Sequence, residues 1–284
     1  MSQVTPIIKW AGGKRQLLPV LKSMLPKEFN TYYEPFFGGG ALFCDLQPAK
    51  SVINDLNIGL IRMYEYIKRD AQGVCRELSC LQAEYNSKVD MTEKDEVYYT
   101  YRNEFNEYLK GDKIYDCRFA ALFIFINKMC FNGLYRVNKR GLYNVPSSHK
   151  KKANVYDEAN IKSMSELLKN TKMTSGDFED CCMNTDKNDF VFFDSPYYDT
   201  YDSYQVGGFS EEDHIRLSEL FKRLSDRGAY CMLTNSNSEF IKDLYKDFNI
   251  LTIDVKRMIN CDASARTGTE IIVTNYEKRL SVIH

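Results

Sequence analysis

The segment Asp194-Ser195-Pro196-Tyr197 follows the apolar run 190–193 and carries groups that could act on a planar amine. The exocyclic amine of a nucleobase is a poor nucleophile because its lone pair is delocalised into the ring. Two acceptors, the Asp194 carboxylate and the Ser195 main-chain carbonyl, would stabilise the positive charge that develops as the amine attacks a methyl sulfonium. Tyr197 could stack on the base, which must leave a duplex to be reached. An acid and a turn that merely close a buried strand are the alternative interpretation.

A glycine-rich loop, Gly38-Gly39-Gly40, precedes Asp55 by fifteen residues. Glycines let the backbone approach a ligand closely, and an acid at the end of the next strand can accept the hydroxyls of a ribose. The dinucleotide pattern G-x-G-x-x-G is absent, and a glycine-rich turn alone is often structural. The loop and the acid together favour a nucleoside ligand. Lys14 follows two glycines but lacks the spacing of a phosphate-binding loop, which excludes a nucleotide triphosphatase.

Metal chemistry has little support in the sequence. The three histidines, His149, His214 and His284, are not paired at helical ligand spacing, so a zinc site is not expected. The nine cysteines include no C-x-x-C pair, and we expect free thiols in a reducing compartment.

Basic residues are concentrated in one segment. Residues 117–156 contain eight bases and no acid, whereas the rest of the chain carries 30 bases and 39 acids. This asymmetry suggests contact with a polyanion, although a solvated basic loop would give the same pattern.

The composition is that of a globular protein, with 44% hydrophobic and 27% charged residues. The longest apolar runs, such as 119–126, are too short to span a membrane, and no signal peptide is recognisable at the N-terminus. We therefore expect a soluble protein.

Strand and helix patterns alternate near both ends of the chain, which predicts an α/β sheet. In the last third, Ser210 and Asp213 can cap a helix that ends at Gly228. The predicted strands, rich in β-branched and aromatic residues, are 31–35, 51–54, 189–194, 229–234, 250–255 and 270–276.

The middle of the chain reads as an inserted helical domain. Apolar residues recur at helical spacing in 58–67, 97–109 and 119–129. At its end, 134–137 and 142–145 flank a turn with Gly141 at a left-handed position, which predicts a basic β-hairpin.

Four motifs occur in order along nearly the whole chain. They are Lys9-Trp10-Ala11-Gly12-Gly13-Lys14, Glu34-Pro35-Phe36-Phe37-Gly38-Gly39-Gly40, Asn132-Gly133-Leu134-Tyr135-Arg136-Val137-Asn138 with Asn144-Val145-Pro146, and Asp194-Ser195-Pro196-Tyr197. They resemble the motifs of Dam-type DNA adenine-N6 methyltransferases, most strongly the Dpn-type enzymes that modify GATC. The resemblance implies S-adenosylmethionine as cofactor and double-stranded DNA as partner. It also implies a Rossmann-like α/β methyltransferase domain in residues 1–57 and 157–284, with a helical target-recognition domain in 58–156 and a β-hairpin at about 130–147.

The resemblance also assigns residues to the cofactor and to the reaction. The implied cofactor contacts are Trp10, Lys14, Phe36, Gly38, Gly39, Gly40, Asp55, Asp177, Phe178 and Asp194. The implied catalytic residues are Asp194, Ser195, Pro196 and Tyr197. The match at Asp177-Phe178 is the shortest of these.

The implied DNA contacts lie mostly in the hairpin. They are Lys9, Phe131, Asn132, Leu134, Arg136, Asn144, Pro146 and Tyr204. Phe131 matches an aromatic residue that inserts beside the bases, and Lys9 a lysine that approaches the first guanine. Arg136 matches a guanine reader, and its guanidinium fork can bond guanine O6 and N7 together.

The chain departs from the family pattern in two places. Ser195 stands where the family has proline, but the required acceptor is a main-chain carbonyl that serine also supplies. The segment 198–209 is shorter than in the Dpn-type enzymes, and in the family this loop closes near the flipped base, where Tyr204 would be an additional stacking partner.

We expect a site-specific adenine DNA methyltransferase that flips its target base in GATC, without a metal. A monomer or weak dimer in the cytoplasm, bacterial or phage-encoded, is expected. Methylation of RNA adenine or of a protein glutamine amide is an alternative, against which the basic aromatic hairpin argues. A non-catalytic DNA-binding regulator is another, and the presence of Asp55, Asp194 and Tyr197 argues against it.

Overall fold

The computed structural model describes residues 4–198, 208–256 and 267–277. The strands in this part of the chain form one seven-stranded sheet in the order β3-β2-β1-β4-β5-β7-β6. The first five strands in this order pair in parallel, and β7 is antiparallel to both β5 and β6. The bounds are β1 (Tyr32–Glu34), β2 (Ser51–Asp55), β3 (Thr171–Ser175), β4 (Phe190–Phe193), β5 (Tyr230–Ser236), β6 (Asn249–Lys256) and β7 (Thr267–Thr274). This arrangement confirms the Rossmann-like α/β sheet, with strands from both sides of the helical segment.

All six predicted strands are present, and one strand was missed. β3, with the sequence Thr-Lys-Met-Thr-Ser, lies at the edge of the sheet and is largely polar. An edge strand is partly solvated and needs no apolar run, so the hydrophobic signal was absent. β7 begins at Thr267, three residues before the predicted start at Glu270.

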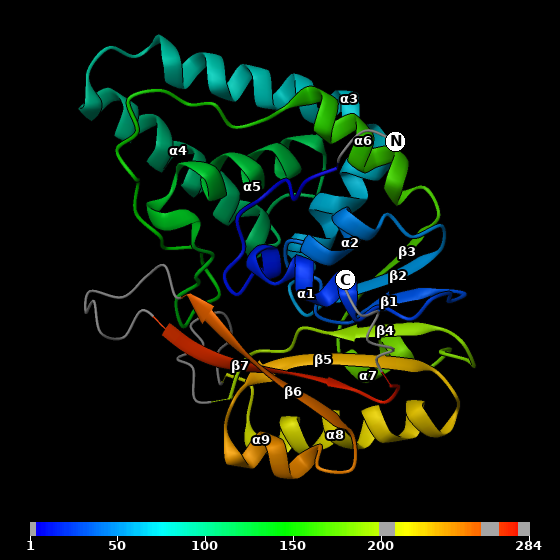
Figure 1. Ribbon diagram of the computed structural model, residues 1–284. Helices are drawn as coiled ribbons and strands as arrows, with labels where there is room; N and C mark the ends of the chain where they lie inside the picture. Colours follow the sequence, from blue (N-terminus) through cyan, green and yellow to red (C-terminus); the bar gives the residue numbers. More distant parts are fainter. Residues whose placement is uncertain (1–3, 199–207, 257–266, 278–284) are drawn as a thin grey trace, which may run out of the picture.

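Three long helices, α3, α4 and α5, lie within residues 58–156, where helices were predicted, and α6 follows this range. Figure 1 shows α3 to α6 on one side of the sheet with α8 and α9 on the other. The bounds are η1 (Lys14–Gln16), α1 (Leu18–Ser23), α2 (Ala41–Leu46), α3 (Ile58–Ser87), α4 (Met91–Lys110), α5 (Cys117–Met129), η2 (Phe131–Gly133), α6 (Glu158–Leu168), α7 (Phe178–Cys182), α8 (Glu211–Asp226) and α9 (Glu239–Leu244).

Local sequence explains where these helices begin. Asn57, Asp90 and Asp116 each accept a hydrogen bond from a backbone N–H in the first turn of α3, α4 and α5. The predicted capping box of α8 is present: Ser210 and Asp213 each bond to the other's backbone N–H. α5 is buried over almost its whole length, so it forms the centre of the helical segment.

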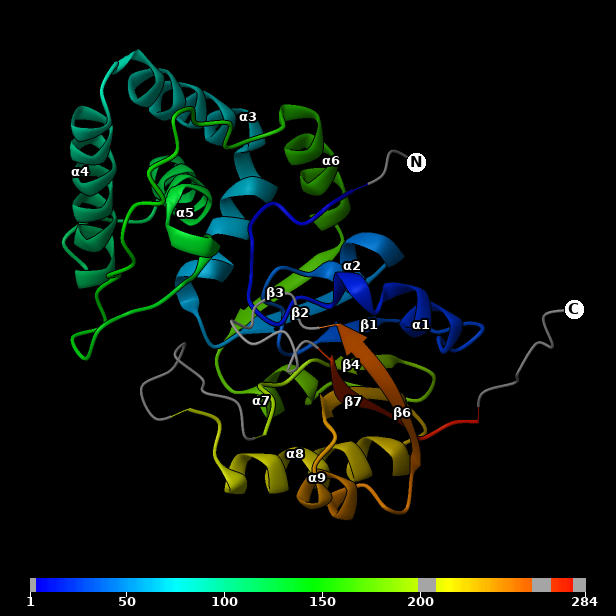
Figure 2. The ribbon, with the colours of Figure 1, turned by 60° about the vertical axis from the view of Figure 1, so that its left-hand side comes forward.

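The sheet separates two apolar layers. In β4, Phe190 and Phe192 belong to the buried cluster that includes residues of α2, α3 and α5, whereas Val191 and Phe193 belong to the cluster that includes residues of α8 and α9. Figure 2 shows the same layers from another side. A parallel strand covered on both faces needs apolar residues at every position, which explains the unbroken run before Asp194.

The predicted β-hairpin is present as an antiparallel turn without regular strands. The segment does turn back on itself, and Gly141 is left-handed with φ +74°. Instead of two strands, however, it has isolated bridges between Cys130 and Ser147 and between Val137 and Tyr143. Backbone bonds cross the turn from the Asn138 N–H to the Leu142 carbonyl and from the Asn144 N–H to the Arg136 carbonyl, and α4 side chains bond other backbone groups of the segment. Asn106 bonds both the N–H and the carbonyl of Tyr143, and the Tyr98 hydroxyl donates to the Val145 carbonyl. We call residues 130–147 the hairpin segment.

Two further findings concern the described residues alone. None of their helices is long and apolar enough to cross a membrane, and no group of three or more potential metal ligands comes together among them. The eight cysteines in this part are free thiols, as predicted; Cys261 lies outside it. The proposed division into domains 1–57 with 157–284 and 58–156 stays a prediction.

Candidate active site

A cavity of about 1450 Å³ lies at the carboxyl ends of the parallel strands. Glu34 ends β1, Asp55 ends β2 and Asp194 directly follows β4, and all three line it. Open α/β sheets bind ligands at this edge. Sixteen residues with predicted site roles line this one cavity: Lys9, Trp10, Lys14, Phe36, Gly38, Gly39, Gly40, Asp55, Asn132, Leu134, Asp177, Phe178, Asp194, Ser195, Pro196 and Tyr197.

The glycine loop packs against aromatic rings that leave no space for side chains. Gly38 has φ +50°, and a Cβ there would lie 2.5 Å from Cδ1 of Trp10. Gly40 has φ +62°, and a Cβ there would lie 2.5 Å from Cζ of Phe37. Both positions therefore require glycine for conformation and for space.

Asp55 is held by backbone donors at the cavity wall. Its Oδ2 accepts from the Gly38 N–H at 2.9 Å, and its Oδ1 accepts from the Asn57 N–H at 2.9 Å. Burial raises the pKa of Asp55 to about 6, against the opposing effect of these two hydrogen bonds. A carboxylate has about four acceptor positions, so both oxygens can still accept a ligand hydroxyl.

Asp194 is paired with a lysine and a threonine. Lys14 Nζ lies 2.5 Å from Asp194 Oδ1, and Thr234 Oγ1 donates to the same oxygen at 2.9 Å. Lys14 also donates to the Gly12 carbonyl at 2.6 Å and lies 4.6 Å from the centre of the Tyr197 ring. Both of these partners bond to Oδ1 of Asp194 rather than to Oδ2.

We call residues 194–197 the tetrad. Two of its other residues, Tyr197 and Ser195, bond to side chains of strands β7 and β5. The Tyr197 hydroxyl donates to Glu270 Oε2 at 2.6 Å. Burial and the charges of Asp194 and Glu270 raise the pKa of Tyr197, so the phenol stays neutral. The Ser195 hydroxyl accepts from Asn235 Nδ2 at 3.3 Å.

Glu34 is a buried acid beside these groups. It is 2% exposed and accepts a hydrogen bond from the Tyr32 hydroxyl at 2.8 Å. Burial, together with the charges of Asp194 and Asp55, raises the pKa of Glu34 well above its usual range. A cationic ligand nearby would therefore favour ionisation of the Glu34 carboxyl group.

Aromatic rings form another wall of the cavity. Phe36 stacks on Phe178 with ring centres 5.4 Å apart, and Phe209 packs against both. Asp177 is occupied by protein partners, because Arg216 Nη2 bonds both of its oxygens at 3.0 Å. The flat apolar rings are suited to a planar heterocycle.

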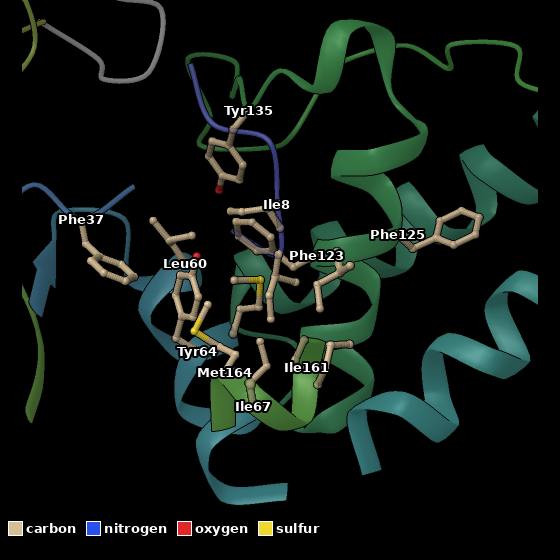
Figure 3. Packing of buried hydrophobic residues seen from close by; sticks show 14 of the residues in the cluster. Ile8, Phe37, Leu60, Tyr64, Ile67, Phe123, Phe125, Tyr135, Ile161 and Met164 are labelled. Atoms are coloured by element: carbon tan, nitrogen blue, oxygen red, sulfur yellow. The ribbon is translucent and has the colours of Figure 1, made fainter. Parts of the chain in front are cut away.

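The hairpin segment is joined to this cavity through Tyr135. The Tyr135 ring centre lies 5.4 Å from both Trp10 and Phe123, and Figure 3 shows the side chain pointing from the hairpin segment toward Ile8 and the core. Buried Asn127 bonds both the N–H and the carbonyl of Lys9, and also the carbonyl of Gly133. The cavity therefore continues from the sheet to the hairpin segment.

Four predicted DNA contacts lie in the hairpin segment outside the cavity lining: Phe131, Arg136, Asn144 and Pro146. Phe131 is 53% exposed, and its N–H donates to the Pro146 carbonyl at 2.9 Å. Arg136 is exposed, and its Nε donates to Asn144 Oδ1 at 2.8 Å. This bond leaves the two terminal nitrogens of the guanidinium for a bidentate contact. Tyr204 lies outside the described residues.

Sequence reasoning missed the residues that support the predicted ones. Thr234, Asn235 and Glu270 come from β5 and β7, more than 35 residues after the tetrad they contact. They have no local spacing that could connect them with Asp194. Tyr135 lies within the third of the four motifs, but no contact with cofactor or DNA was predicted for it.

Comparison with known proteins agrees with this geometry. The family model for D12 class N6 adenine-specific DNA methyltransferases matches residues 10–259. The type II methyltransferase M.MjaIII of Methanocaldococcus jannaschii is 42% identical over 96% of this chain and 100% of its own length. The type II methyltransferase M1.LlaDCHI of Lactococcus lactis subsp. cremoris is 42% identical over 95% of each chain. The DNA adenine methylase of Escherichia coli strain K12 is 28% identical over 98% of this chain and 97% of its own. The chain therefore belongs to the D12 class of N6 adenine-specific DNA methyltransferases.

Proposed function

We propose that this enzyme transfers a methyl group from S-adenosylmethionine to N6 of an adenine in double-stranded DNA, within GATC, after flipping that adenine out of the duplex. The observation that carries the proposal is the single cavity shared by Asp55, the tetrad 194–197 and the hairpin segment. Family membership favours DNA over the alternatives of RNA or a glutamine amide, and an enzyme over a non-catalytic regulator.

The residues of the cavity fit S-adenosylmethionine. The cofactor supplies an electrophilic methyl group on a positively charged sulfur. Glu34, Asp55 and Asp194 provide carboxylates for a cationic ligand, and Lys14 provides a cation for its carboxylate. Asp55 would accept the ribose hydroxyls, and Phe36 and Phe178 would flank the adenine ring.

The tetrad would activate the substrate amine. Asp194 Oδ2 and the Ser195 carbonyl would each accept one N–H of the adenine N6, which favours a tetrahedral nitrogen with an available lone pair. Asp194 could take up the proton that N6 loses after methylation. Tyr197, anchored by Glu270 and neutral, would present its ring face to the base.

Base flipping is supported by the size and course of the cavity. Pockets for a single small ligand measure about 300 to 1000 Å³, so about 1450 Å³ leaves room for a cofactor and an extruded base. The amine of an adenine inside a duplex could not reach Asp194, which is half-buried beneath this cavity.

Recognition of GATC would depend on the hairpin segment. Arg136 is exposed, and Asn144 holds its Nε, which orients the guanidinium for a guanine edge. Lys9 is exposed and lines the cavity, with its side chain next to Gly133. We also propose that the enzyme acts in the cytoplasm, where its DNA substrate would lie, as a monomer or weak dimer.

Incubation of the purified protein with labelled S-adenosylmethionine and unmethylated DNA tests the proposal. The expected product is N6-methyladenine at GATC, with protection from nucleases that cut only unmethylated GATC. A duplex with 2-aminopurine in place of the target adenine should become more fluorescent on binding. Label in another motif would contradict the sequence assignment, and label in cytosine or in RNA would contradict the activity.

A further inference from the structure

The tetrad carries Ser195 where the family pattern that its motifs resemble has proline, and this serine has a specific partner. Proline fixes φ and stiffens a turn, whereas serine leaves the backbone free. Ser195 is 2% exposed, and its Oγ lies 3.3 Å from Nδ2 of Asn235, which is fully buried on the neighbouring strand β5.

The orientation of the Asn235 amide is fixed by backbone donors. Its Oδ1 accepts from the Tyr198 N–H at 3.1 Å and from the Ser236 N–H at 2.8 Å. Only the oxygen of an amide can accept from these donors, so Nδ2 must be the group that faces Ser195. Asn235 therefore bonds to Ser195, the second residue of the tetrad, and to Tyr198, the residue directly after the tetrad.

This arrangement restrains the turn whose carbonyl would accept the adenine amine. A carbonyl that misses the developing charge by a fraction of an ångström loses much of its effect, because the stabilisation depends on preorganised geometry. Asn235 donates to the Ser195 hydroxyl and accepts from the Tyr198 N–H, and so holds both ends of the segment between these residues.

We propose that Asn235 is a positioning residue for methyl transfer, and that its bond to the Ser195 hydroxyl replaces the restraint of a proline ring. The inference rests on the proposed role of the Ser195 carbonyl as an amine acceptor. Asn235 would not touch the substrate.

The test compares two substitutions at Ser195. Ser195→Ala removes only the hydroxyl, whereas Ser195→Pro removes the hydroxyl and restores a ring. One lost hydrogen bond predicts a fall of about tenfold in the single-turnover rate for Ser195→Ala, with KM for DNA and cofactor unchanged. Ser195→Pro should be faster than Ser195→Ala, because the ring restrains the turn that the hydroxyl no longer holds.

Asn235→Ala, measured both in the wild type and in the Ser195→Pro variant, separates a positioning role from an effect on general stability. Asn235→Ala should slow methyl transfer in the wild type and should cost clearly less when combined with Ser195→Pro, although the bond to Tyr198 is lost in both. Melting temperatures identify any variant that is merely unfolded, and the Ser195 pair alone is decisive if Asn235→Ala does not fold.

Three outcomes would overturn the inference: Ser195→Ala as fast as the wild type, Ser195→Pro as slow as Ser195→Ala, or equal losses from Asn235→Ala in both backgrounds. Failure of the wild type to methylate adenine would instead overturn the proposed function. The two failures are therefore distinguishable.

Discussion

Lys14 Nζ and Asp194 Oδ1 form a 2.5 Å ion pair between the N-terminal motif and the tetrad. The side chain of Lys14 is 7% exposed and that of Asp194 is 17% exposed, so water screens this pair only weakly. Lys14 thus lies between the region proposed for the cofactor and the carboxylate proposed to bind the substrate amine. We therefore expect Lys14 to contribute both to cofactor binding and to the position of the Asp194 carboxylate.

Replacement of Lys14 by methionine should weaken cofactor binding and lower the stability of the protein. Cofactor affinity should fall by about 1.5 to 3 kcal/mol, because a charged hydrogen-bond donor is lost. The melting temperature should also fall, because a half-buried Asp194 loses its counter-ion. Calorimetric titration with S-adenosylmethionine and thermal denaturation measure the two effects.

Lys22 provides the matched control for this prediction. It also pairs with an aspartate, Asp45 at 2.8 Å, but its side chain is 53% exposed. Exposed pairs contribute about 0 to 1 kcal/mol, so Lys22→Met should change little. Equal behaviour of the two variants would contradict a role of Lys14 in the site.

Asp194→Ala should abolish methyl transfer while DNA binding stays nearly intact. The substitution removes the acceptor for the adenine amine rather than a phosphate contact, and one such partner commonly lowers a barrier by about 3 kcal/mol or more. Single-turnover methylation and a DNA-binding titration measure the two properties. A rate above a few per cent of wild type would show that another group accepts the amine.

The elements that could be predicted are those with a strong local signal. The unbroken apolar run of β4 and the capping box of α8 follow directly from burial and from helix-end chemistry. β3 escaped prediction because an edge strand needs no apolar residues. The bonds that Asn106 and Tyr98 of α4 make with the backbone of the hairpin segment join residues 37 and 47 apart in the sequence, so no local pattern predicts them.

The same distinction between local sequence signals and long-range contacts applies to the candidate active site. Motif spacing pointed to Asp55 and Asp194, which lie at the carboxyl ends of β2 and β4, the two parallel strands on either side of β1, and therefore meet at one edge of the sheet. Thr234, Asn235 and Glu270 meet the tetrad only because β5 lies beside β4, and β7 beside β5, in the folded sheet. No local pattern encodes such contacts.

Cofactor affinity should fall as pH decreases through about 6. Burial raises the pKa of Asp55 from 3.8 to about 6 in the free protein, whereas ribose hydroxyls bond best to the ionised form. Without cofactor, the raised pKa means that the contribution of Asp55 to folding stability is largest below about 3.8 and is lost as pH rises through about 6. Cofactor binding opposes this loss because it favours the charged carboxylate.

Titrations with S-adenosylmethionine at several pH values between about 5 and 8 check this prediction. Wild-type affinity should drop by up to about tenfold per pH unit below about 6. Asp55→Ala should bind more weakly, by about 1.5 to 3 kcal/mol at neutral pH, with a flat profile. A profile that persists in Asp55→Ala would assign the titration to another acid, of which Glu34 is the nearest candidate.

Arg136→Ala should reduce discrimination at one base pair rather than binding to DNA in general. If the guanidinium forks onto a guanine, its loss costs about 1 to 3 kcal/mol at that position and relaxes specificity there. If Arg136 contacts only phosphate, affinity falls evenly for all sequences and the salt dependence weakens by about one unit. Asn144 accepts from Arg136 Nε at 2.8 Å, so Asn144→Ala should relax specificity at the same base pair, to a smaller degree.

The control is the triple alanine variant of Lys150, Lys151 and Lys152, which are exposed just after the hairpin segment. These lysines should act as phosphate contacts, so their loss should weaken methylation of every substrate and reduce its salt dependence. The measurement is methylation of GATC and each of its single-base variants at two salt concentrations, for wild type, Arg136→Ala, Asn144→Ala and the triple variant. Equal losses on all substrates for Arg136→Ala would show that the hairpin segment holds DNA by charge, and that its sequence is read by other residues.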